Sequence, residues 1–192
     1  FLPRAAEEGW LVLFGHGLGY ALREPRIRPL LVTGMSVEVF GFSYHTMVPV
    51  MARDVLGVGA AGYGFLLSAA GAGALAGTLT MAAVGDVRQK GRLVALLAAG
   101  FGAGLALFGG SPWLPLAMAA IGAAQASAMA YDITLTTLLQ QTARAEMRGR
   151  VISLQILTYG LSPMGGVQAG AVATLLGAPA ALLLNGGVTA AA

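Results

Sequence analysis

The most constraining feature of this sequence is the length of its uncharged runs. No charged residue occurs between Arg92 and Asp132, and none occurs after Arg150. An α-helix needs about 20 consecutive apolar residues to cross the hydrocarbon core of a bilayer. Strand-like alternation is weak, and the runs are too long for the strands of a membrane β-barrel. The sequence therefore predicts an all-α membrane protein.

The charged residues divide the chain into six candidate membrane-spanning helices. The sequence begins without a methionine and ends inside an apolar run, so we interpret it as part of a longer protein whose last helix is truncated. The predicted spans cover residues 29–52, 59–84, 93–110, 113–141, 151–176 and 178–192.

Composition excludes several other classes of protein. Hydrophobic residues make up 57% of the chain and charged residues only 10%, whereas a soluble domain is about 25% charged. The net charge of +3 does not indicate a nucleic-acid partner, because the basic residues form short clusters between apolar runs. The absence of cysteine and the presence of only two histidines argue against a structural zinc site. We expect no metal and no cofactor.

The basic residues also predict the orientation of the chain. If six helices alternate in direction, every lysine and arginine except Arg53 falls on the same side of the membrane. The positive-inside rule makes that side cytoplasmic. We therefore expect a cytoplasmic N-terminus in a protein that crosses the membrane several times.

Residues 1–28 form a predicted cytoplasmic linker that precedes the membrane half-domain at 29–192. Within the linker, residues 10–22 are apolar but too short to cross a bilayer, and Arg23 and Arg26 follow them. This pattern is typical of a helix that lies in the membrane–water interface. A mobile linker with some apolar residues is the alternative interpretation.

Three sequence segments resemble the major facilitator superfamily of transporters. The segment GLGYALREPRIRPLL at 17–31 is similar to the entry to the seventh helix of these proteins, and RGRVISL at 148–154 is similar to the opening of the eleventh. The segment GDVRQKGR at 85–92 resembles the signature loop between the eighth and ninth helices. It departs from the usual pattern at Val87, where an arginine is common, and at Ala82, where a glycine is common. The likeness extends to the bacterial efflux branch that includes enterobactin and macrolide exporters.

The resemblance implies that this chain is the C-terminal six-helix half of such a transporter, in the inner membrane of a bacterium. The lipid bilayer and a missing N-terminal six-helix half are then its structural partners. In this superfamily the first and fourth helices of each half line a central cavity. We therefore expect the first and fourth predicted spans to carry the functional side chains.

The candidate site residues are ionisable or polar groups deep within predicted spans. Glu38 and His45 lie in the first span, seven residues apart, which places them on the same face of a regular helix. Intramembrane ionisable residues are costly and mark substrate or proton pathways by default. The fourth and fifth spans supply the remaining candidates for substrate or proton contacts, which are Gln125, Asp132, Gln155 and Tyr159.

The connection between the second and third spans carries Asp86, Arg88 and Arg92. By the resemblance, charge interactions of this loop hold one conformation of the transporter and break in the other. These residues are therefore candidates for conformational gating. The alternative is that the basic residues only hold the loop on the cytoplasmic side.

The function that these features favour is export of a small organic molecule of the drug or siderophore type, driven by proton entry. Substrate and protons are then the transported partners, and no catalytic residue is expected. A six-helix binding or scaffold protein is one alternative. An intramembrane aspartyl protease is another, because the surroundings of Asp132 and Asp86 faintly resemble the motifs of those enzymes.

Overall fold

The computed structural model describes residues 10–85 and 87–192, and these ranges contain helices and no strand. The all-α prediction is confirmed for this part of the chain. The elements run in the order α1 (Trp10–Arg23), α2 (Ile27–Ser36), η1 (Val37–Gly41), α3 (Tyr44–Val50), η2 (Met51–Val55), α4 (Gly59–Val84), α5 (Lys90–Gly109), α6 (Leu114–Thr142), α7 (Arg148–Tyr159), α8 (Ser162–Leu176) and α9 (Ala178–Ala191).

Three of these helices, α4, α5 and α6, are long and apolar enough to cross a membrane. Much of their surface is exposed and apolar; Leu75 of α4 and Leu96 of α5 are 61% and 69% exposed. Exposed leucines on this scale are unfavourable in water but favourable against lipid tails. In the rest of the described chain the helical segments are shorter, so the count of six spans stays a prediction.

The first predicted span, residues 29–52, is divided into α2, η1, α3 and η2 rather than being one helix. In η1 the chain makes a π-helical turn, in which the amide of Phe42 donates to the carbonyl of Val37 at 3.1 Å. A second π-helical turn, η2, follows Pro49, which has no N–H to donate within its helix. Such turns accommodate one extra residue and often occur at functional sites.

The fifth predicted span, residues 151–176, is likewise divided into α7 and α8. The interruption lies at Gly160 and Leu161, immediately before Pro163. Glycine has a low helix propensity, and proline is tolerated in the first turn of a new helix, so this sequence favours a break here. The short α9 then returns along the bundle, and the hydroxyl of Thr33 in α2 donates to the carbonyl of Ala192 at 3.1 Å.

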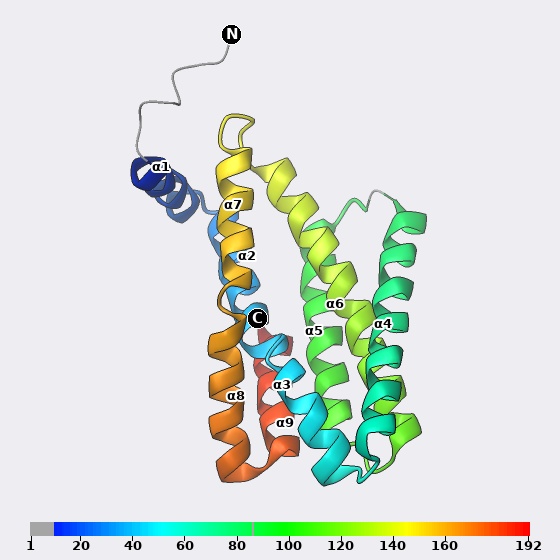
Figure 1. Cartoon of the computed structure of the whole chain (residues 1–192). Coiled ribbons are helices and arrows are strands. Elements are labelled where there is room, and N and C mark those ends of the chain that lie inside the picture. Colours follow the sequence, from blue (N-terminus) through cyan, green and yellow to red (C-terminus); the bar gives the residue numbers. More distant parts are fainter. Residues whose placement is uncertain (1–9, 86) are drawn as a thin grey trace.

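The connections between the helices gather at two ends of the bundle. Figure 1 shows α1, the α4–α5 connection and the α6–α7 connection at one end, and the η2–α4, α5–α6 and α8–α9 connections at the other. The first end carries Arg88 and Arg148, as the alternating topology predicts. The second end carries Arg53, whose guanidinium binds Asp54 at 2.6 Å. This hydrogen bond lowers the pKa of the Asp54 carboxyl from its ordinary value, so Arg53 adds no net charge to its end.

Small residues allow the long helices to approach closely. A side chain on Gly73 or Gly77 of α4 would overlap the backbone of α6, at Gly122 and Ala126 respectively. The spacing of four residues puts both glycines on one helix face, which is the arrangement of a GxxxG packing motif. Gly170, by contrast, has open space beside it.

Candidate functional site

An open pocket of about 350 Å³ lies where η1, α3, α6 and the α7–α8 break meet. An adjoining pocket of about 560 Å³ continues along α3 and α8. The two breaks in the helices therefore face the same space. Four of the predicted site residues line the first pocket together with three others, and the full set is Glu38, Phe42, His45, Met129, Asp132, Tyr159 and Ser162.

Glu38 lies in the π-helical turn η1 and is only 9% exposed. Its carboxyl group is close enough to Asp132 of α6 for their charges to interact. Two carboxylates that share a site disfavour simultaneous ionisation. This pair can therefore hold a proton or the positive charge of a ligand between two helices.

Asp132 is joined to the fifth predicted span by a hydrogen bond. The hydroxyl of Tyr159, the last residue of α7, donates to a carboxyl oxygen of Asp132 at 2.9 Å. Tyr159 is 41% exposed, so the bond lies at the open side of the pocket. The break after Tyr159 leaves its side chain between α6 and α8, and any movement of α7 against α6 must lengthen or break this bond.

His45 is exposed and lies at the start of α3. Its ring packs near those of Tyr44 and Phe42, with centroids 4.2 Å and 6.2 Å away. Glu38 and His45 line the same pocket, although η1 and the turn at Phe42 and Ser43 interrupt the regular helix on which the prediction relied.

Gln125 and Gln155 do not line this pocket. Gln155 of α7 is 3% exposed and donates from its side-chain amide to the hydroxyl of Thr136 in α6 at 2.7 Å. This bond joins α6 to α7 next to the bond between Asp132 and Tyr159. Gln125 precedes Asp132 on α6 and lies outside the pocket. Within the described residues, the buried oxygen of its side-chain amide has no hydrogen-bond partner.

The geometry is that of a membrane-embedded acidic pocket, and a comparison with known families agrees with it. The family model described as transmembrane secretion effector, which belongs to the major facilitator superfamily, matches residues 3–192. The chain belongs to this family. It is therefore a transporter-type membrane protein rather than a typical enzyme. No curated protein and no solved structure matches the chain.

A second polar group lies beside the pocket, and the sequence analysis did not select its members Asn185 and Ser43. The side-chain amide of Gln168 in α8 donates to Asn185 of α9 at 3.2 Å, and Asn185 donates to the hydroxyl of Ser43 at 2.9 Å. Ser43 in turn donates to the carbonyl of Phe40 at 2.6 Å, within the break of the first span. One signal was present in the sequence, because Asn185 is the single asparagine of the chain and lies in an uncharged run.

Tyr131 is a further residue that the sequence analysis did not select. It precedes Asp132 on α6, is 2% exposed, and within the described residues its hydroxyl has no partner. A buried hydroxyl without a partner is costly.

The gating candidates of this family member lie at the end of the bundle that carries α1. Asp86 lies outside the described residues. Arg88 and Arg92 are exposed, and Arg92 donates to the side chain of Gln89 at 3.1 Å. The structure thus places both arginines on the surface near the α4–α5 connection, and their gating role stays a prediction.

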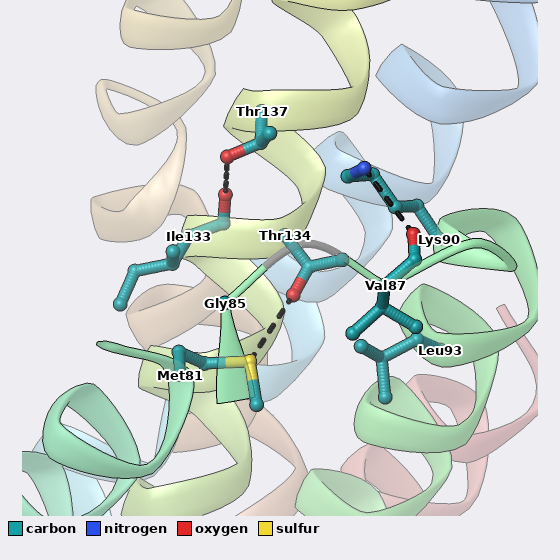
Figure 2. Close-up of a pocket in the computed structure, with 8 residues that line it drawn as sticks. All are labelled: Met81, Gly85, Val87, Lys90, Leu93, Ile133, Thr134 and Thr137. Atoms are coloured by element: carbon teal, nitrogen blue, oxygen red, sulfur yellow. Dashed lines mark hydrogen bonds between the residues drawn. The ribbon is translucent and has the colours of Figure 1, made fainter. Parts of the chain in front are cut away.

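A pocket of about 250 Å³ lies beside this connection, between the ends of α4 and α5 and the side of α6 (Figure 2). Figure 2 shows that its polar groups already have protein partners: Thr134 donates to the sulfur of Met81, Thr137 to the carbonyl of Ile133, and Lys90 to the carbonyl of Val87. The pocket around Glu38 therefore remains the stronger candidate for a transport site.

No lysine or arginine is among the described residues that line the pocket around Glu38. In the described part of the chain the one salt bridge is that between Arg53 and Asp54, and no three acidic or histidine side chains are grouped closely enough to hold a metal ion. Within the pocket, His45 is therefore the basic side chain beside Glu38 and Asp132.

Proposed function

We propose that this chain is the C-terminal half of a secondary transporter that exports a small organic molecule of the drug or siderophore type in exchange for protons. The observation that carries the proposal is the pair Glu38 of η1 and Asp132 of α6, which line one pocket that has no lysine or arginine among its lining residues. Placing an ionised carboxylate at the bilayer centre costs about 2.5–3.5 kcal/mol on insertion scales. A protein that retains two such groups in one pocket gains a means of binding protons.

The open side of the pocket supports the remainder of the proposal. A central cavity between two halves of a transporter needs one wall from each half, and this pocket supplies a wall with acidic, aromatic and hydroxyl groups from Glu38, Phe42, Tyr159 and Ser162. Aromatic faces bind organic cations through their π-electrons, and the carboxylates add charge attraction. We expect substrates that carry a positive charge or several hydrogen-bond donors.

Transport by the full-length protein in liposomes tests this function. We expect that addition of a substrate on one side moves protons in the opposite direction, as recorded by a pH-sensitive dye trapped inside. Substrate flux without proton movement would contradict proton exchange and would indicate that another driving force powers export. Binding without any flux would favour the alternative of a six-helix binding or scaffold protein.

We further propose that the end of the bundle with α1 faces the cytoplasm of a bacterial inner membrane. Among the residues that the structure describes, all lysines and arginines except Arg53 belong to segments at that end, and Arg53 is balanced by Asp54. These 192 residues contain no cysteine, so single cysteines can serve as reporters. We expect a membrane-impermeant maleimide to label Arg53→Cys in intact cells and to label Arg88→Cys only after permeabilisation. The reverse pattern would invert the orientation.

A further inference from the structure

A second pocket, of about 520 Å³, lies between α1 and the start of α7, far along the chain from the carboxyl pair. Figure 1 shows α1 beside the end of α7 at the end of the bundle where the α6–α7 connection lies. The pocket is lined by Gly15, Gly19, Tyr20, Arg23, Met147 and Arg150. Two guanidinium groups from separate helices thus share one cavity, and none of the lining residues is acidic.

The pocket is held in place by contacts between α1 and the rest of the chain. The backbone amide of Arg144, in the α6–α7 connection, donates to the hydroxyl of Tyr20 at 3.3 Å. Ala21 of α1 is buried, and the side chain of Arg150 packs closely over Gly17. The glycines on α1 keep the space between the two helices open, because a larger side chain there would fill it.

The guanidinium groups retain donors for a ligand. Arg150 donates to the sulfur of Met147 at 3.8 Å, which uses one of its five N–H groups on a weak acceptor. Among the described residues neither Arg23 nor Arg150 forms a salt bridge. The nearby carboxyl groups, those of Glu24 and Glu146, are not among the lining residues. An arginine pair with free donors is suited to a phosphate group, which it can bind with several charge-assisted hydrogen bonds.

The position of α1 indicates where such a phosphate comes from. Another face of α1 carries Leu18 and Leu22, which are 40% and 57% exposed and line a separate pocket with residues of α2 and α7, and Arg23 follows them in the last turn. A helix with exposed leucines and a terminal arginine lies in the membrane–water interface, at the depth of the lipid head groups. Basic pockets on the cytoplasmic side of helix bundles attract anionic lipids.

We propose that the pocket between α1 and α7 binds the phosphate head group of an anionic phospholipid, which Arg23 and Arg150 hold from opposite sides. The lipid fixes α1 against α7, which is the helix that carries Tyr159 to the carboxyl pocket. The site is separate from the transport pocket and stands whether or not the protein exchanges protons.

Native mass spectrometry of the full-length transporter, purified in detergent, tests the proposal. The protein is mixed with phosphatidylglycerol, with phosphatidylcholine, or with inorganic phosphate. We expect retained phosphatidylglycerol on the unaltered protein and about tenfold weaker retention by Arg23→Gln/Arg150→Gln, because charge-assisted hydrogen bonds are lost. Arg88→Gln is the matched control, since Arg88 is an exposed arginine at the same end but does not line the pocket. It should retain phosphatidylglycerol normally.

If the protein retained phosphatidylglycerol and phosphatidylcholine equally, the proposal would be wrong. It would also be wrong if the double variant retained as much phosphatidylglycerol as the unaltered protein. Displacement of phosphatidylglycerol by millimolar inorganic phosphate would show that the pocket binds a free anion, and would contradict the proposal that it binds a lipid. If the double variant fails to fold, Arg23→Gln alone serves, because Arg23 is exposed and its replacement disturbs no described contact. Unchanged lipid retention by that single variant would also contradict the proposal.

Discussion

Replacing Glu38 by glutamine is expected to abolish proton-driven transport while the protein remains in the membrane at near-normal abundance. Glutamine keeps the size and hydrogen-bonding capacity of glutamate but cannot release or take up a proton. Glu38 is almost fully buried in η1 and interacts with the charge of Asp132. Since a carboxylate in the membrane costs stability, its removal should not harm folding. The measurement is uptake into vesicles with an imposed pH gradient, compared with substrate binding by the same preparation.

The change Asp132→Asn is the natural control for Glu38→Gln. Asp132 also accepts a hydrogen bond from Tyr159, and asparagine can still accept it. If both variants lose transport but keep binding, the two carboxyl groups act as a coupled pair. Normal pH-driven transport by Glu38→Gln would remove Glu38 from the mechanism and leave Asp132, or a residue outside this chain, as the proton carrier.

The change Gly73→Ala is expected to lower the stability of the protein. The added carbon would overlap the carbonyl oxygen of Gly122, and backbone atoms cannot move aside as a flexible side chain can. Overpacking of this kind costs about 1–3 kcal/mol, and the small residues are what allow the backbones of α4 and α6 to approach closely. The loss should appear as a lower midpoint of thermal unfolding in detergent.

Gly71→Ala in the same helix is the matched control. Gly71 is exposed, and no atom lies within 4 Å of the position of an added carbon. Alanine has the higher helix propensity, by about 0.5–1 kcal/mol, so this variant should be as stable as the unaltered protein or more so. Equal unfolding midpoints for the two variants would show that α4 and α6 do not pack as closely as the structure has them.

The class of the fold was predictable from the sequence because it depends on one-dimensional features. The uncharged runs predict helices, and the structure has a helix at Gly59–Val84, where the second span was expected. The division of the first span was harder to predict. Pro49 is a visible signal for η2, but the sequence around Val37–Gly41 has no proline to mark the π-helical turn. That turn depends on packing, since a side chain on Gly165 of α8 would overlap the carbonyl oxygen of Val39.

The candidate site was predictable where a single residue is itself unusual. Glu38 and Asp132 are ionisable groups in apolar runs, and the structure brings them together with His45 and Tyr159. The network from Gln168 through Asn185 to Ser43 was not found, because hydrogen bonds between residues about 140 positions apart leave no local pattern. Gln155 does not line the pocket and its side chain donates to Thr136, so its role as a substrate contact stays a prediction.

The extra residue in η1 has a consequence for comparing this chain with its relatives. In an α-helix each residue turns the chain by about 100°, so adding one residue in a π-helical turn rotates everything that follows by that amount. Glu38 of η1 and His45 of α3 line the pocket from either side of the turn at Phe42 and Ser43. A relative that lacks one residue between Val37 and Gly41 can still present the same groups to its cavity if its helix is regular there. Sequence alignments of this segment should accordingly permit a gap of one residue.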